Sequence, residues 1–377
     1  MAWQRRQVVG ALGAAALAWP WASRAQRSNR LILGQSAAFS GPAAQLGIEL
    51  HRGAKLCFDA FNAAGGLNGT TIEIQALDDG YDPERCKANT AKLLGQDVFA
   101  LFGYVGTPTS LAALPQVRDS KTPFFAPFTG AMALREPMLR QVFHVRASYD
   151  DETALIVRQL TSIGLKRIAV FRQNDSYGQA GLDGVEKALR PLELAPVAVG
   201  TVERNSVEVA AAVKSIVAAQ PNAVVLISAY KSCAAFIRAA KAAGYGGTFY
   251  NVSFVGTQAL ADELGPAGNG VMISEVMPSP FNQKVAIVRD YLDQLRKTGG
   301  PAQPNYSGIE GYIAARTFIE GLRRARSVSA EGLVAGLESL KGHSLGGFNL
   351  DFSATSRVAS RFVDLAMLDG KGGVARH

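Results

Sequence analysis

The sequence predicts an α/β protein built from two doubly wound lobes with parallel sheets. From Leu31 onward, short apolar runs alternate with amphipathic stretches, which is the pattern of repeated strand–helix units. With 377 residues, the chain is too long for one comfortable core, so two domains are expected. The alternation restarts near Asp150, and the second half repeats the plan of the first.

The first half is expected to form one lobe with its own core. Its first helix is ended by Gly65-Gly66, and Pro83 and Pro108 each open a further helix. The expected strands are 31–36, 71–77, 99–103 and 123–127, and the expected helices are 45–64, 83–96 and one that begins at 108.

The second half is expected to form the other lobe, followed by segments that return to the first. The expected helices are 150–163, 177–192, 207–219 and 230–243, and the expected strands are 167–172, 196–202, 223–228, 248–252 and 270–276. Three more helices follow without strands between them, at 283–297, 308–324 and 330–340. Because they have no sheet nearby in sequence, we expect them to cover the first lobe.

The tail is expected to cross back to the second lobe with two strands, 348–352 and 361–368. The first lobe would then comprise residues 30–148 and 279–347, and the second lobe residues 149–278 and 348–377. Three crossings between two lobes make a hinge, which suits a cleft that closes on a ligand.

The N-terminal segment 1–25 has the pattern of a secretory signal. Arg5-Arg6 precedes an apolar, alanine-rich run, and Ser23-Arg24-Ala25 is a small-x-small cleavage pattern. The paired arginines indicate the twin-arginine route to the periplasm. Removal of this segment, which holds three arginines and no acids, lowers the formal net charge from +8 to +5.

Charge and cysteine content exclude some classes of protein. The mild positive charge comes without a run of basic and aromatic residues, so no nucleic-acid partner is expected. The odd number of cysteines, Cys57, Cys86 and Cys233, excludes a fully paired disulfide framework. Cys57 lies on an apolar helix face, and Cys86 starts a helix expected on the opposite face of the sheet, so no bridge is expected between them.

Loops that follow the predicted strands carry glycines and hydroxyl groups. In 104–109, Thr107 suits the N-cap of the next helix and Pro108 its first position. Similar loops occur at 127–130 and 174–178. Ligands bind at the carboxyl ends of strands in open parallel sheets, and a helix N-terminus there favours a carboxylate or phosphate. We therefore expect these loops to capture a small molecule.

Several motifs occur in an order and spacing that resemble a known family. They are Ser40-Gly41-Pro42, the segments 62–69, 78–83, 103–110 and 126–130, Asp175-Ser176-Tyr177-Gly178, and Glu310-Gly311-Tyr312. From about Leu31 to Leu368, the chain resembles the exported solute-binding proteins of ABC transporters, of the leucine/isoleucine/valine-binding type. The resemblance implies the type I periplasmic binding protein fold, no catalysis and no cofactor. It also implies a free amino acid or small acid between the lobes and an inner-membrane ABC permease as partner. We expect a monomer.

By position in its motif, Thr107 resembles the hydroxyl that holds the ligand carboxylate in this family; a plain helix cap is the alternative. Thr129 and Gly130 resemble the second carboxylate loop, although a turn that closes the strand is equally compatible. Tyr177 and Tyr230 resemble tyrosines of the second lobe that reach across the cleft. For each tyrosine the alternative is packing over the start of its own helix.

The resemblance breaks at Ser253-Phe254, where binders of branched-chain amino acids carry an acid that neutralises the ligand ammonium. The segment 251–256 contains no acid. A buried ammonium without a partner is costly, so Asp175 or Glu310 would have to replace it, or the ligand has no amine. An aromatic or 2-oxo acid therefore deserves the same weight as an amino acid. Phe39 is expected either to wall the cleft or to anchor its loop.

Two further kinds of protein stay open at this stage. A ligand sensor of the same fold needs the same closing cleft, and a misread signal would favour a cytosolic amide-sensing regulator. An α/β hydrolase is disfavoured because G-x-S-x-G and H-E-x-x-H are absent. No metal site is expected, since the histidines, His51, His144, His343 and His377, show no metal-ligand spacing.

Overall fold

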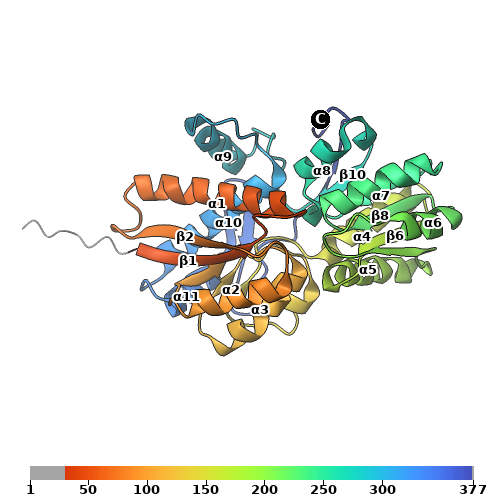
Figure 1. Cartoon of the computed structure of the whole chain (residues 1–377). Coiled ribbons are helices and arrows are strands. Elements are labelled where there is room, and N and C mark those ends of the chain that lie inside the picture. Colours follow the sequence, from red (N-terminus) through yellow and green to blue (C-terminus); the bar gives the residue numbers. More distant parts are fainter. Residues whose placement is uncertain (1–29, 376–377) are drawn as a thin grey trace, which may run out of the picture.

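Two parallel sheets wrapped by helices form the two lobes of the computed structural model, which describes residues 30–375 (Figure 1). The predicted signal segment 1–25 lies outside the described residues. The chain thus has the predicted fold class, two doubly wound α/β lobes. Most expected helices and strands occur within a few residues of their predicted bounds.

The first sheet has the strand order β2-β1-β3-β4-β5, and its neighbouring strands are parallel. Its strands are β1 (Arg30–Ala37), β2 (Thr71–Asp78), β3 (Ala100–Phe102), β4 (Phe124–Phe125) and β5 (Val142–Phe143). One core contains apolar residues of α1 (Ala44–Ala63), α9 (Ala286–Lys297), α10 (Tyr306–Arg324) and α11 (Ala330–Glu338). A separate core contains those of α2 (Pro83–Leu94) and α3 (Thr107–Asp119). The late helices therefore complete the first lobe, as predicted.

The second sheet has the strand order β13-β10-β9-β8-β6-β7, in which β13 is antiparallel to β10. Its strands are β6 (Ile168–Gln173), β7 (Val199–Val202), β8 (Ala223–Ile227), β9 (Thr248–Asn251), β10 (Met272–Glu275) and β13 (Asp364–Met367). The helices of this half are α4 (Tyr149–Ser162), α5 (Ser176–Leu189), α6 (Ala210–Ala218), α7 (Tyr230–Ala242) and α8 (Thr257–Leu264). Short 3₁₀ turns are η1 (Met132–Leu134), η2 (Arg190–Leu192), η3 (Ser253–Val255) and η4 (Gly265–Gly268).

The first tail strand does not join the second lobe, contrary to expectation. β12 (Asn349–Asp351) pairs with β11 (Lys341–Ser344) in a separate two-stranded sheet. Phe348 and Phe352 on either side of β12 belong to the first-lobe core, where Phe352 packs edge-on against Phe143 at 5.3 Å between ring centroids. These apolar contacts hold residues 348–352 on the first lobe, and only β13 continues into the second sheet.

The three cysteines of the described chain are buried and free, and Cys57 is a core residue, as predicted. Cys57 lies in the core beneath α1 and α10, whereas Cys86 lies in the separate core beneath α2 and α3. Burial raises the pKa of the Cys57 thiol to about 12, so this side chain is a neutral core group.

Helices α1 and α10 approach each other closely because glycines lie where they touch. A Cβ atom on Gly53 would lie 1.8 Å from the carbonyl oxygen of Gly308, and one on Gly311 would lie 2.0 Å from that of Leu50. Both distances are far inside van der Waals contact with rigid backbone. This pair of helices joins the early and late parts of the first lobe.

We predict that Gly311→Ala lowers the free energy of unfolding by about 1–3 kcal/mol, because the added methyl group forces the helices apart. Alanine is the better helix former, so a loss of stability in spite of this isolates the packing effect. Urea unfolding measures the change. Gly246→Ala is the control, since its Cβ would meet no atom within 4 Å. Equal stabilities of the two variants would contradict the close helix contact.

Candidate functional site

Loops at the carboxyl ends of strands from both lobes meet at one interface. Tyr81, after β2, accepts a hydrogen bond from Gln173 Nε2 at the end of β6, at 3.2 Å. Beside it, Asn205 Nδ2 donates to the Gly80 carbonyl oxygen at 3.2 Å, and the Arg204 guanidinium lies 6.0 Å from the Tyr81 ring centroid. The two lobes are therefore in direct contact where the sequence predicts a cleft.

The two threonines predicted from separate loops lie side by side. Thr107 Oγ1 is 2.6 Å from Thr129 Oγ1, and Thr129 Oγ1 donates to the Tyr149 hydroxyl at 3.4 Å. Both threonines are buried. Gly130 permits this arrangement, because a Cβ there would lie 2.5 Å from the Tyr149 backbone nitrogen, which donates to the Gly130 carbonyl. The result is a row of hydroxyl groups that ends at the start of α4.

Helix α3 begins one residue earlier than predicted. Its N-cap is Gly106, Thr107 is the first helical residue and Pro108 the second. Gly106 has a φ of 103°, and a Cβ there would lie 2.3 Å from the Tyr81 ring. The expectation that Thr107 is the N-cap is therefore wrong, because only glycine fits the turn beneath Tyr81. The Thr107 hydroxyl still lies at the helix N-terminus.

Aromatic rings from both lobes surround Phe254. Its ring centroid lies 4.7 Å from that of Tyr177, 5.6 Å from Phe128 and 5.8 Å from Tyr81. Tyr177 also packs against Tyr149 at 5.4 Å. The Tyr177 hydroxyl is buried and has no hydrogen-bond partner within residues 30–375. Burial raises the pKa of Tyr177 well above its ordinary value, so this hydroxyl is neutral and can donate a hydrogen bond to an acceptor.

Other residues singled out in the sequence have structural partners. Phe39 packs edge-on against His51 at 5.6 Å, which is the loop-anchor role. Tyr230 is buried and bonds to the backbone at Gln45 near the start of α1, so it joins the lobes at the edge of the interface. Asp175 caps α5 by accepting from the backbone of Tyr177, and it forms an ion pair with Arg204 at 3.3 Å.

A buried group of charges, not foreseen from the sequence, lies at the first crossing between the lobes. Arg146 Nε is 3.2 Å from Glu310 Oε1 on α10, and the Arg146 guanidinium lies 4.5 Å from the Phe128 ring centroid. Arg146 Nη2 also donates to Ser253 Oγ. Ser253 in turn donates to Glu152 on α4, from its backbone N–H at 2.7 Å and from its hydroxyl at 3.0 Å. Hydrogen bonds to Arg146 and Glu152 therefore fix the position of Ser253.

The carboxyl groups of Glu310 and Glu152 have higher pKa values than exposed carboxyl groups. Burial raises the pKa of Glu310 to about 7, although the neighbouring Arg146 opposes the shift. Burial also raises the pKa of Glu152. Neither residue offers a free carboxylate to a ligand, since Glu310 pairs with Arg146 and Glu152 accepts from Ser253 and Ser274.

Arg135 connects the Thr129 loop to the same crossing. Its Nη2 donates to the carbonyl oxygens of Arg146 at 2.9 Å and Ala147 at 3.1 Å, and its Nη1 to those of Thr129 and Ala131 at 3.4 Å. The residue is 8% exposed. The Thr129 loop and the crossing are thus positioned by one side chain.

Residues 32–373 match the model of the periplasmic binding protein family. The chain belongs to this family. It is 34% identical to a solved structure from Rhodopirellula baltica, described as a possible leucine/isoleucine/valine-binding protein, with a TM-score of 0.89 over 93% of this chain and 97% of that one. A substrate-binding periplasmic protein from Ralstonia solanacearum is 30% identical, with a TM-score of 0.86 over 91% and 99% of the two chains. A Leu/Ile/Val-binding protein homologue from Brucella suis is 22% identical over 85% of this chain and 83% of the relative.

The predicted residues fall into two sets in this member of the family. Thr107, Thr129, Tyr177 and Phe254 share one buried interface, whereas Phe39 and Tyr230 lie toward its margins. Tyr81, Tyr149, Arg146 and Glu152 were missed. Tyr81 lies inside a motif noted in the sequence, at 78–83, and its positive φ of 63° marks it as unusual only once the backbone is known. Among the described residues, no helix is long and apolar enough to span a membrane, and no cluster of three potential metal ligands occurs.

We predict that Glu310→Gln flattens the pH dependence of stability. The folded pKa of about 7 lies above the ordinary 4.5, so the folded protein keeps a proton that the unfolded chain loses. The free energy of unfolding therefore falls as pH rises through this window. Glutamine cannot titrate, so the slope should become shallower by up to about 1.4 kcal/mol per pH unit. Urea unfolding across the window tests this, with the exposed Glu208→Gln as control; an unchanged slope in Glu310→Gln would refute it.

Proposed function

We propose that the protein binds a small carboxylic acid between its lobes in the periplasm and delivers it, unaltered, to an ABC importer. The supporting observation is a set of buried polar atoms at strand ends that have no hydrogen-bond partner within the described chain. These atoms are Ser110 Oγ in the first lobe and Gln173 Oε1, Tyr177 OH and Ser228 Oγ in the second. An unpaired buried polar group costs roughly 1–3 kcal/mol, so a ligand that pairs with these atoms would be favoured.

A carboxylate is the ligand group that suits the first-lobe side. The hydroxyls of Thr107 and Ser110 lie in the first turn of α3, where the helix dipole favours negative charge. Hydroxyl and N–H donors to a carboxylate form short, strong hydrogen bonds. The rings of Tyr177, Phe128 and Phe254 would cover an apolar or aromatic body next to it.

The ligand proposed here has no α-amine. Asp175 caps a helix, Glu310 pairs with Arg146, and Glu152 accepts hydrogen bonds from Ser253, so each nearby acid is already engaged. An ammonium would lack a counter-charge at a cost of several kcal/mol in a buried site. An aromatic or 2-oxo acid avoids this cost. We also propose that the chain is exported to the periplasm by the twin-arginine route.

Closure of the lobes would be driven by contacts that the acid makes to both at once. Thr107 and Ser110 come from the first lobe and Tyr177 from the second, so a ligand that bonds to both favours the closed arrangement. Only such differential affinity can shift an equilibrium between open and closed forms. The closed form is the one that a permease would recognise.

Pairs of ligands that differ only at the amine test the ligand class. We predict that phenylpyruvate binds at least ~100-fold more tightly than phenylalanine, and 4-methyl-2-oxopentanoate more tightly than leucine, because the unpaired ammonium costs about 3 kcal/mol or more. Isothermal titration calorimetry measures the affinities. A ligand at 100 times its Kd also raises the free energy of unfolding by roughly 2.7 kcal/mol, which a thermal-shift assay detects. Tighter binding of the amino acids would contradict the proposal that the ligand has no amine.

Hydroxyl deletions test the site itself. Thr107→Val and Tyr177→Phe should each weaken binding of the best acid by about tenfold or more, because each removes a buried hydroxyl group that the proposed ligand would contact. Calorimetry on chains that are purified in the native state, without refolding, gives the Kd values. The matched controls are Thr317→Val, buried in α10, and Tyr245→Phe, in the second-lobe core. Unchanged affinity in the first two variants would place the ligand elsewhere.

A further inference from the structure

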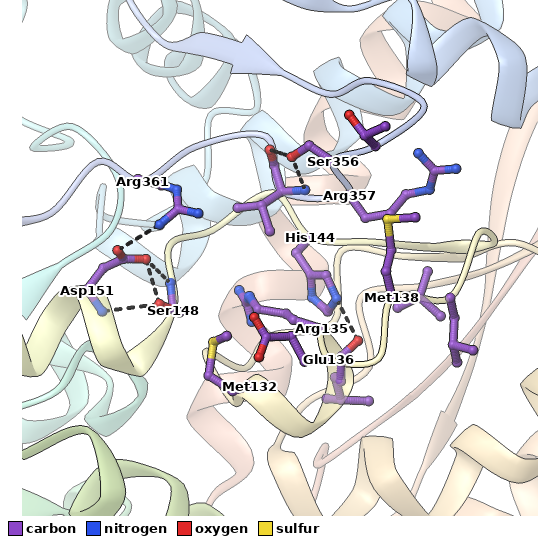
Figure 2. A pocket seen from close by; sticks show the side chains of 15 residues that line it. Met132, Arg135, Glu136, Met138, His144, Ser148, Asp151, Ser356, Arg357 and Arg361 are labelled. Atoms are coloured by element: carbon purple, nitrogen blue, oxygen red, sulfur yellow. Dashed lines mark hydrogen bonds and ion pairs between the residues drawn. The ribbon is translucent and has the colours of Figure 1, made fainter. Parts of the chain in front are cut away.

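A pocket lies at the hinge and shares none of its lining residues with the interface around Phe254. It has a volume of about 230 Å³. Its lining comes from three places: eight residues between Met132 and His144, Ser148 and Asp151 at the start of α4, and five residues between Thr355 and Arg361 of the tail. Figure 2 shows Met138, His144 and Arg135 on one side of it and Asp151 with Arg361 on another. The lining therefore includes two of the chain segments that cross between the lobes.

Arginines outnumber acids in this lining. Arg135, Arg357 and Arg361 face only Glu136 and Asp151. Arg357 is paired with Glu338 outside the pocket at 2.6 Å, and Arg361 lies 3.6 Å from Asp151. The remaining cation is Arg135, which has no acid within ion-pair distance among residues 30–375 and bonds only to backbone carbonyl groups.

The donors and acceptors of the pocket wall are not all used. Arg135 Nε is buried and, within the described chain, has no hydrogen-bond acceptor. His144 is fully buried, and its Nε2 donates to the Leu134 carbonyl oxygen at 3.1 Å, since a carbonyl can only accept. Burial and the nearby Arg135 lower the pKa of His144 well below its ordinary value, so the ring adds no charge. The positive charge of the wall thus comes from arginine alone.

Apolar side chains make up most of the rest of the lining, together with the hydroxyl groups of Ser148, Thr355 and Ser356. Met132, Leu134, Met138, Leu139, Val142 and Val358 surround the charged groups, and Met138 is 46% exposed at the rim. Apolar walls around a cation without a counter-ion suit a molecule with a carboxylate and a short hydrocarbon body. An amine would meet the arginines and be repelled.

We propose that this pocket is a second binding site for a small amphiphilic carboxylate and that its occupation favours closure of the lobes. A molecule held between η1, the start of α4 and the tail contacts two crossings at once. Arg135 forms part of its wall and also holds the carbonyl groups of Thr129 and Ala147. Occupation of the pocket is therefore linked to the positions of the Thr129 loop and the hinge, and linkage of this kind is reciprocal. The link to ligand affinity rests on the proposed function, whereas the pocket itself does not.

Methionine methyl groups report on the pocket independently of the first site. With ¹³C-methyl methionine labelling, we expect hexanoate to shift the NMR signals of Met132 and Met138 saturably. The signals of Met272 in β10 and of Met277 in the first-lobe core, both outside the pocket, should stay unchanged. The signal that is missing from the spectrum of Met138→Leu is the signal of Met138. 1-Hexanol and hexylammonium have the same body without the negative charge, and they should bind at least about tenfold more weakly. Equal binding of the three compounds, or no shift with hexanoate, would overturn the proposal.

Reversal of the charge at Arg361 tests whether hexanoate binds in this pocket. Arg361→Glu should weaken the hexanoate-dependent shifts by about tenfold or more, as should the milder Arg361→Gln to a smaller degree. The matched control Arg326→Glu makes the same change at an exposed arginine outside the pocket and should leave the shifts unaltered. Thr107→Val, which impairs only the first site, should also leave them unaltered. Loss of the shifts in Thr107→Val would instead assign hexanoate to the first site and refute the second.

The link between the sites is measured as a change in affinity. Saturating hexanoate should tighten phenylpyruvate binding about fivefold in the wild-type protein and not in Arg361→Glu. An unchanged Kd in both chains overturns the link. If phenylpyruvate and the other acids bind to neither chain, the proposed function fails, and the methionine signals still decide whether the pocket exists as a site.

Discussion

The buried Arg146 guanidinium ties together three separate parts of the chain where it first crosses between the lobes. Arg146 lies in the first crossing, Glu310 belongs to a helix of the first lobe, and Ser253 belongs to a loop of the second. Removal of one partner from a buried ion pair is far more costly than loss of an exposed pair, since the other charge stays desolvated. The geometry of the hinge is therefore restrained by charge, and Glu152 extends this restraint to the start of α4 through Ser253.

Local patterns were sufficient to predict the architecture. Strand and helix periods depend on nearby residues, and so do the glycines and prolines that end each element. Strand ends also indicated the loops that hold Thr107, Thr129 and Tyr177, because the carboxyl ends of parallel strands meet at one edge of a sheet. The choice of these residues within the loops came from the resemblance to the family. Short elements were not predicted from these patterns. β5 contains only Val142–Phe143, and α8 begins after Gly256 with a positive φ of 81°.

Long-range contacts could not be predicted from local patterns. Arg146 and Glu152 look like ordinary surface residues in the sequence, and their burial depends on partners more than 100 residues away. The acid missing from 251–256 illustrates this point. An acid does contact that loop, but it comes from α4, and Ser253 already occupies it. Residues 348–352 were assigned to the wrong lobe because nothing local indicates that Phe352 packs on Phe143.

The glycine contact between α1 and α10 has a consequence for how the chain matures. Gly53 emerges from the ribosome long before Gly308, its neighbour in the finished protein. Until then, the apolar side of α1 that includes Phe58 and Phe61 lacks the helix that covers it. The second lobe is nearly continuous in sequence, apart from β13, so it can gain its shape while the first lobe still waits for its last third. Newly made chains therefore expose this apolar surface until α10 has been synthesised, and transiently exposed apolar surface is prone to aggregation.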